Sequence, residues 1–186
     1  MPRVSTYLNF PRSTEAAFLF YKSVFGTEFT APIARFRDIP ASPDQPPLAE
    51  GDKDLVMHVE LPILGGHVLM GTDAPESMGF TVTPGNNVYI NLEPDTRAEA
   101  RRLVDALSAG GSIEMPLQEM FWGGYFASFI DRFGIRWMLN CASIGIGSTS
   151  HLSCEMLRSL AGIDLVHVPY KGEANVITDL LAGQVQ

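Results

Sequence analysis

The chain has 186 residues, 46% of them hydrophobic and 10% aromatic, which suffices for one globular domain of about 150 residues plus an appendage. Its formal net charge of −8 argues against nucleic-acid binding, which needs clustered lysine and arginine side chains. The polar N-terminus does not resemble a signal peptide, and the sequence has no apolar run of about 18 residues. We therefore expect a cytoplasmic protein that binds neither nucleic acid nor membranes, with Cys141 and Cys154 as free thiols.

The first half of the chain predicts a strand, a helix and three further strands. The helix has an apolar face at the spacing i, i+3, i+4, i+7 and ends at Gly26, a typical residue just past a helix. Proline-rich Asp38–Asp54 is expected to be a loop, and Gly65-Gly66 to be a hairpin turn. The strands expected here are Val4–Phe10, Glu28–Arg37, Leu55–Leu61 and His67–Asp73.

The same order of elements returns after a connector, Ala74–Gly85, that is marked by proline and glycine. Thr96 and Glu99 form a capping-box pattern at the start of a second helix, which Gly110-Gly111 ends. An internal repeat of this size restricts the fold strongly, and it predicts an α+β domain of two βαβββ modules. The strands expected in the second module are Asn87–Glu93, Ile113–Trp122, Tyr125–Asp131 and Ile135–Cys141.

Two strands of the second module alternate polar and apolar side chains in a way that suits a ligand pocket. A polar row beside an apolar one can bind a small molecule through a few convergent hydrogen bonds. Arg136 can pair either with an anionic ligand or with a surface carboxylate. The alternating residues are Asn87, Tyr89 and Asn91 on one strand, and Arg136, Met138 and Asn140 on the other.

The aromatic residues around the next turn have two interpretations. Phe121, Trp122 and Tyr125 flank Gly123-Gly124, and their rings either line the pocket or pack in the core or a dimer interface.

The first hairpin contains His58, Glu60 and His67, for which we expect structural or solvated roles rather than metal ligation. A two-residue turn at Gly65-Gly66 places Leu61 opposite Met70, and a slip of one residue would place Glu60 there instead.

Three stretches together resemble the glyoxalase/bleomycin-resistance/extradiol-dioxygenase (vicinal oxygen chelate) superfamily, in particular its demethylubiquinone-methyltransferase-like branch. They are TYLNF…STEAAFLFYKSVFG, HVELPILGGHVLMGTDAP and EMFWGGYFASFIDRFGIRWML. The resemblance covers residues 3–141. It implies paired βαβββ modules that form a U-shaped sheet around a small-molecule pocket, usually in a homodimer.

The resemblance also implies four metal-ligand positions, which fall on Thr6, Met70, Asn87 and Met138. Enzymes of the superfamily use His, Glu or Gln there, whereas thioethers, a hydroxyl and an amide are poor ligands for a divalent metal. We therefore expect no catalytic residues, no metal and no cofactor, and a small-molecule-binding protein of sequestering or resistance type. The alternative is a metal-dependent lyase, isomerase or dioxygenase. The expected pocket residues are Thr6, Met70, Asn87, Tyr89, Trp122, Tyr125, Arg136 and Met138.

The composition of the sequence changes after Cys141, where a run of small residues begins. We expect a domain at 1–141, with modules at 1–75 and 85–141, followed by a linker and a helix–strand–helix tail at 142–186. The tail resembles a fragment of the solute receptors of tripartite tricarboxylate transporters, and about forty residues are too few to form a stable core alone. It is either a fusion from rearranged or misread genes or a captured dimerisation arm.

Overall fold

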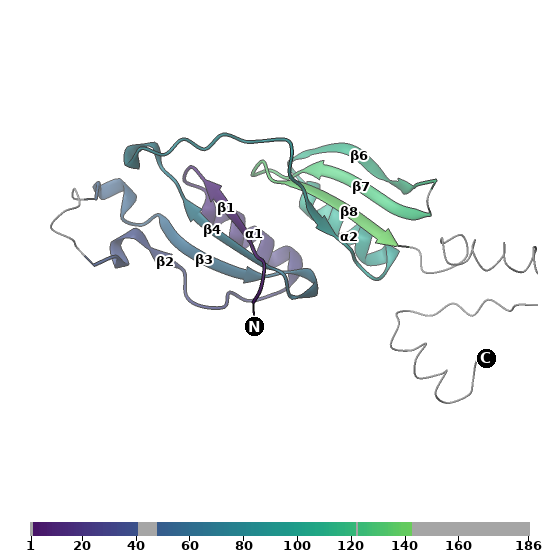
Figure 1. Ribbon diagram of the computed structural model, residues 1–186, viewed down its shortest axis with the longest axis horizontal. Helices are drawn as coiled ribbons and strands as arrows, with labels where there is room; N and C mark the ends of the chain where they lie inside the picture. Colours follow the sequence, from purple (N-terminus) through teal and green to yellow (C-terminus); the bar gives the residue numbers. More distant parts are fainter. Residues whose placement is uncertain (1, 41–47, 122, 143–186) are drawn as a thin grey trace, which may run out of the picture. The chain divides into compact units, whose positions relative to one another are not determined.

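The computed structural model describes residues 2–40, 48–121 and 123–142, which form two sets of strands with one helix each (Figure 1). The first unit comprises Met1–Val88 and Arg132–Ile135. The second comprises Tyr89–Asp131 and the strand that begins at Arg136. No helix in this described part of the chain is long and apolar enough to cross a membrane.

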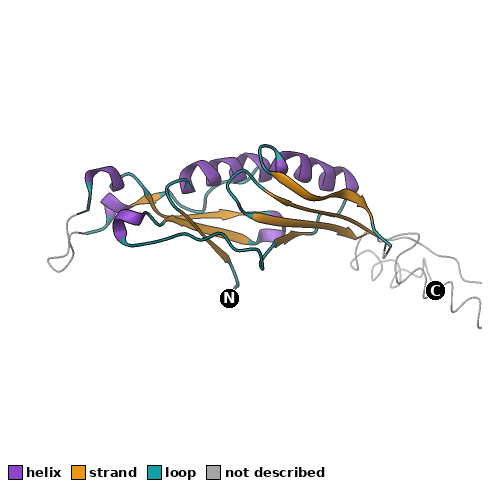
Figure 2. Ribbon diagram, turned by 90° about the horizontal axis from the view of Figure 1, so that it is seen from above, coloured by secondary structure: helices purple, strands orange, loops and turns teal. Residues whose placement is uncertain are grey.

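The first unit contains a four-stranded sheet in the order β1-β4-β3-β2, with β1 parallel to β4 and the other pairs antiparallel. Helix α1 lies along one face of this sheet (Figure 2). Short 3-10 helices interrupt the loops. The elements are β1 (Thr6–Phe10), α1 (Thr14–Phe25), β2 (Ala34–Arg35), η1 (Phe36–Asp38), η2 (Glu50–Asp52), β3 (Val56–Pro62), η3 (Leu64–Gly66), β4 (Val68–Asp73) and η4 (Glu76–Met78).

The second unit repeats the arrangement with a sheet in the order β5-β8-β7-β6, in which β5 is parallel to β8. Helix α2 contacts β6, β7 and β8. The predicted α+β fold of two βαβββ modules is therefore confirmed. The elements are β5 (Ile90–Leu92), α2 (Arg97–Ser108), β6 (Ser112–Glu119), β7 (Gly124–Ile130) and β8 (Arg136–Ala142).

The core of the first unit lies between α1 and the sheet. Phe18 of α1 is fully buried, as are Leu61 and Leu69 on the strands. Gly71 permits this close approach, because a Cβ atom at that position would lie 2.4 Å from the Phe18 ring. Both the apolar helix face and this glycine thus set the distance between helix and sheet.

Helix α1 begins in a way that the sequence did not reveal. The Ser13 side chain at the helix start makes no capping hydrogen bond. Instead, the buried carboxylate of Asp73 accepts hydrogen bonds from the Thr14 backbone N–H (3.0 Å) and hydroxyl (2.8 Å). The other Asp73 oxygen accepts from the Val56 N–H at 2.9 Å. A strand residue therefore satisfies the helix terminus. The other end matches the prediction, since Gly26 has a left-handed φ of 65°.

The capping box predicted for α2 is formed only in part. The Thr96 hydroxyl accepts a hydrogen bond from the Glu99 N–H at 3.2 Å. The Glu99 carboxylate instead binds the Arg102 guanidinium, at 2.7 and 2.8 Å.

Two predictions about the first sheet are wrong. The strand expected at Glu28–Arg37 is reduced to Ala34–Arg35, in a segment where Pro32 has no N–H to donate to a neighbouring strand. The hairpin turn is longer than two residues because η3 occupies it, so Leu61 lies opposite Leu69 and Glu60 lies opposite Met70.

The helix–strand–helix predicted at 142–186 falls outside the described residues, except that Ala142 is the last residue of β8. Residue 142 therefore belongs to the strand rather than to the linker.

Candidate functional site

The first unit contains a pocket of about 480 Å3 that lies against the ends of β1 and β4. Its walls come from η1, η4 and the connector after η4, and we call it the connector pocket. Its lining residues are Asn9, Phe36, Thr72, Asp73, Ala74, Met78, Phe80, Thr81, Val82 and Thr83.

Two uncharged polar side chains in the lining of the connector pocket come from neighbouring strands. Asn9 of β1 and Thr72 of β4 lie level with one another in the parallel ladder, so both side chains point to the same face of the sheet. That face is opposite the one that Gly71 presents to α1. The strand pairing therefore brings an amide and a hydroxyl together in the pocket lining.

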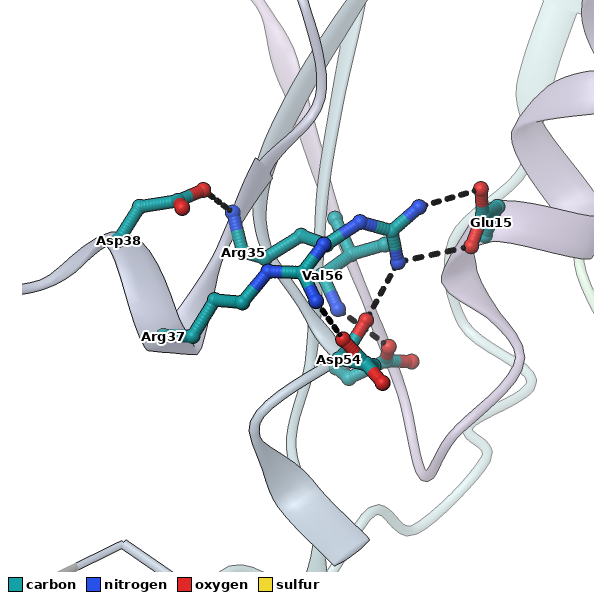
Figure 3. Close-up of polar contacts among 7 residues, drawn as sticks. Glu15, Arg35, Arg37, Asp38, Asp54 and Val56 are labelled. Atoms are coloured by element: carbon teal, nitrogen blue, oxygen red, sulfur yellow. Dashed lines mark hydrogen bonds and ion pairs between the residues drawn. The ribbon is translucent and has the colours of Figure 1, made fainter. Parts of the chain in front are cut away.

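Phe36 forms one apolar wall of the pocket. Figure 3 shows the polar contacts of Arg35 and Arg37, the residues on either side of Phe36 in the sequence. Arg35 makes a bidentate ion pair with Glu15 of α1, at 2.7 and 3.0 Å, and its Nη1 also donates to the Asp54 carbonyl at 2.5 Å. Arg37 pairs with the Asp54 carboxylate. The two arginines that flank Phe36 thus tie η1 to the helix and to the start of β3, which positions the ring.

A second anchor holds the part of the lining that follows η4. The Ser77 hydroxyl of η4 donates to the buried carboxylate of Asp52 at 2.5 Å, and Arg12 pairs with the same carboxylate at 2.7 Å. These contacts hold the pKa of Asp52 below its usual value, chiefly through the Ser77 hydrogen bond. Because Met78 follows Ser77 directly in the sequence, this hydrogen bond helps to position Met78 and Phe80 in the pocket lining.

The one carboxylate in the lining is already engaged. Both oxygens of Asp73 accept hydrogen bonds from Thr14 and Val56, as described above. The remaining polar groups in the lining are three threonine hydroxyls and the Asn9 amide. Such a pocket suits an uncharged molecule with apolar surface and a few hydrogen-bonding groups.

Among the predicted pocket residues that the structure describes, none lines the connector pocket. Thr6 lies level with Leu69 and binds His67 Nε2 at 2.9 Å, whereas Met70 lies level with Tyr7. Thr6 and Met70 therefore point to opposite faces of the sheet. Met70 shares the face of Thr72, two residues away, and Asn87 is exposed on the chain before β5.

In the second unit the structure brings three of the predicted residues to one face. Asn91 lies level with Met138, which places Tyr89, Arg136 and Met138 on the same side of the β5–β8 pair. The Asn140 amide oxygen on β8 is buried and has no hydrogen-bond partner within the described residues. Tyr125 lies level with Cys141, so its side chain points to the face opposite that of Met138 and Asn140. The Tyr125 hydroxyl accepts a hydrogen bond from Arg101 of α2 at 3.3 Å. Tyr125 therefore belongs to the helix side, and Trp122 lies outside the described residues.

Arg136 pairs with a carboxylate, which was one of its two predicted roles. It contacts Glu114, and its Nη1 lies 2.9 Å from the Tyr89 hydroxyl, which in turn donates to Glu114 at 2.8 Å. The Tyr89 and Arg136 contacts keep the pKa of Glu114 below its usual value. The three side chains form a hydrogen-bonded network in which the positive charge of Arg136 lies against the negative charge of Glu114.

The residues at the expected metal-ligand positions do not fit a divalent metal. They offer a hydroxyl that is bound to His67, two thioethers and one exposed amide. Within residues 2–40, 48–121 and 123–142, no group of three His, Cys, Asp or Glu side chains could hold a metal ion.

Comparison with known proteins agrees with this fold. Residues 6–139 match the Glyoxalase/Bleomycin resistance protein/Dioxygenase superfamily. The chain belongs to this superfamily. Residues 136–186 match a second family, the tripartite tricarboxylate transporter family receptor (TctC). The chain spans only 14–24% of the length of the curated proteins that match this second segment.

Three known proteins match the superfamily domain of this chain over nearly their whole length. Protein YjdN of Escherichia coli K12 is 29% identical over 146 residues, which is 74% of this chain and 93% of YjdN. The crystal structure of PA1353 from Pseudomonas aeruginosa is 34% identical with a TM-score of 0.64, over 76% of this chain and 98% of that one. A Bacillus cereus PhnB protein, a putative 3-demethylubiquinone-9 3-methyltransferase, is 28% identical with a TM-score of 0.55, over 76% and 100%.

Sequence reasoning missed the connector pocket because its walls come from segments without periodicity. Phe36 and Phe80 are isolated aromatic residues in stretches interpreted as a strand and a connector. The one available signal was the presence of exposed apolar residues in a glycine- and proline-marked connector, where a turn alone needs none. Phe80 is 52% exposed and Met78 38% exposed.

Proposed function

We propose that this superfamily domain binds a small, uncharged, partly apolar molecule in the connector pocket without a divalent metal, as a sequestering or resistance-type protein. The observation that carries the proposal is the lining itself, which combines Phe36, Met78 and Phe80 with threonine hydroxyls and the Asn9 amide. Aromatic and apolar walls supply affinity, and the few polar groups fix the orientation of the ligand.

The volume of the pocket supports a ligand of modest size. About 480 Å3 lies within the usual range for small-molecule sites, which runs from about 300 to 1,000 Å3. The anchors on either side of the pocket also favour binding, because a preformed site loses less entropy when it takes up a ligand.

Binding of small aromatic probes tests the proposal. We expect Phe36→Ala and Phe80→Ala each to weaken binding roughly ten-fold, about 1.4 kcal/mol, as measured by titration calorimetry. Phe29→Ala is the matched control, because Phe29 contacts the Lys22 ammonium and does not line the pocket. Equal effects of all three substitutions would contradict binding at this site. Mass spectrometry of the denatured protein can identify a molecule that co-purifies.

The alternative function is that of a metal-dependent lyase, isomerase or dioxygenase. Metal analysis distinguishes it from the metal-free binding protein. We expect protein purified without chelator to contain far less than one equivalent of Ni, Zn, Mn or Fe per chain. About one equivalent would favour the enzyme and overturn the metal-free proposal.

We also propose that the protein is a cytoplasmic homodimer. The dimer is an expectation from the superfamily, and the cytoplasmic location rests on the composition of the sequence. Light scattering and cell fractionation test these two proposals separately.

A further inference from the structure

The hydroxyl of Thr72, which lines the connector pocket, has its proton committed to the protein backbone. Thr72 Oγ1 donates to the Val56 carbonyl and to the Asp73 carbonyl, both at 3.2 Å. A hydroxyl has one proton, and a carbonyl oxygen has none to give in return. The two contacts therefore share that proton in a three-centre hydrogen bond, and only the lone pairs of Oγ1 remain. To a molecule in the pocket, Thr72 is a hydrogen-bond acceptor.

The Asn9 side chain on the neighbouring strand can both donate and accept. It is exposed and makes no hydrogen bond to another residue in the part of the chain that the structure describes. A side-chain amide carries two N–H donors and a carbonyl acceptor. Asn9 lies level with Thr72 on the same face of the parallel β1–β4 pair, and neighbouring strands are about 4.8 Å apart. One edge of a small molecule can therefore contact both side chains at once.

This pair of side chains selects two complementary groups on a ligand. An N–H group can donate to Thr72 Oγ1, and a carbonyl beside it can accept from the Asn9 amide. A lactam presents these two groups side by side on one edge of a ring. Both groups are uncharged, which suits a lining whose one carboxylate, that of Asp73, already accepts hydrogen bonds from Thr14 and Val56.

The apolar part of the lining favours a planar ring. Phe36 and Phe80 contribute aromatic surface, and the Met78 thioether makes favourable contacts with aromatic rings. Phe80 is 52% exposed, so a ligand that covers it removes apolar surface from water. A volume of about 480 Å3 leaves room for a flat bicyclic molecule.

We propose that the ligand of the connector pocket is a neutral, planar lactam, whose N–H donates to Thr72 Oγ1 and whose carbonyl accepts from the Asn9 amide. This inference deepens the proposed function and rests on it, since it needs a ligand in that pocket.

The test compares 2-quinolinone with coumarin, which has the same bicyclic shape and carbonyl but a ring oxygen in place of the N–H. By titration calorimetry we expect the unmodified chain to bind 2-quinolinone roughly ten-fold more tightly, because coumarin offers Thr72 no donor. Thr72→Val keeps the branched shape and removes the acceptor, so this preference should disappear. Thr30→Val is the matched control and should keep the preference, because the Thr30 hydroxyl donates to Glu60 and does not line the pocket.

A second variant tests the carbonyl contact independently of Thr72. In Asn9→Ala the affinity of coumarin relative to naphthalene, which has no polar group, should fall roughly ten-fold. The preference for 2-quinolinone over coumarin should remain, because both molecules carry the carbonyl. Asn9 is exposed, so we expect this variant to fold.

The outcomes separate this inference from the proposed function. If the unmodified chain binds 2-quinolinone and coumarin equally, or if Thr72→Val keeps the preference, the lactam assignment is wrong and the binding function stands. If none of the three probes binds, the proposed function and the lactam assignment both fail. Circular dichroism checks the fold of each variant. Should Thr72→Val not fold, an unchanged ratio of coumarin to naphthalene in Asn9→Ala is enough to overturn the inference.

Discussion

The Ser77 hydroxyl donates a hydrogen bond to a carboxylate oxygen of Asp52, with 2.5 Å between the two oxygens. This bond joins η4 to η2, although the two residues are 25 positions apart in the sequence. Asp52 is buried, whereas its partner Arg12 is half exposed. A buried carboxylate needs such partners, and here they lie beside the residues that form a wall of the connector pocket. The contact therefore links the stability of this region to the shape of the site.

Asp52→Asn should weaken both the fold and probe binding. The pKa of Asp52 is lowered in the folded chain, so its contribution to stability is complete above the ordinary carboxyl value of about 4 and is lost as the pH falls through the folded value. Urea unfolding at several pH values should show that the difference between the original chain and Asp52→Asn shrinks under acid. A difference that grows as the pH falls would contradict this assignment. Asp105→Asn is the control, because Asp105 is an exposed residue of α2 and does not line the connector pocket.

Gly71→Ala should destabilise the first unit by about 1–3 kcal/mol, because the new methyl group would overlap the Phe18 ring. Gly51→Ala is the matched control, since its Cβ would meet only the end of the Arg12 side chain, at 3.9 Å. Urea denaturation measures both changes in the free energy of unfolding. Similar losses in the two variants would show that α1 does not pack tightly at Gly71.

Trp122→Ala should weaken ligand binding more than it lowers the melting temperature. This remains a prediction from the sequence, based on the position of Trp122 beside Gly123-Gly124. Trp137→Phe provides the contrast, because Trp137 is fully buried and its Nε1–H donates to Asp131 at 2.8 Å. A large loss of melting temperature in Trp122→Ala, with unchanged affinity, would assign that ring to the core.

A chain that ends at Ala142 should remain folded, because both βαβββ modules are complete at that residue. The sequence beyond it carries two short apolar patterns, which are too small for a core of their own. Melting curves and light scattering compare the shortened and full chains. A shortened monomer beside a full-length dimer would indicate a dimerisation arm, and an insoluble shortened chain would show that the domain boundary is wrong.

The repeat and its helices were readable from the sequence because helix periodicity is a local property. The apolar face of α1 lies within one run of twelve residues, and Gly26 ends that helix in the left-handed conformation that was expected. The motifs that resemble the superfamily are also contiguous stretches. Element type and family membership therefore needed no knowledge of which strand pairs with which.

The binding site depended on the tertiary structure, because a strand places alternate residues on opposite faces and a shift of one residue exchanges them. The three-residue η3 turn made Glu60 rather than Leu61 the neighbour of Met70, which put Glu60 and Tyr7 on one face. The connector pocket likewise joins residues from four separate segments of chain, and Asp73 caps a helix that begins 59 residues before it. The sequence by itself determined the modules, and only the pairing of strands and the packing of loops decided which side chains meet.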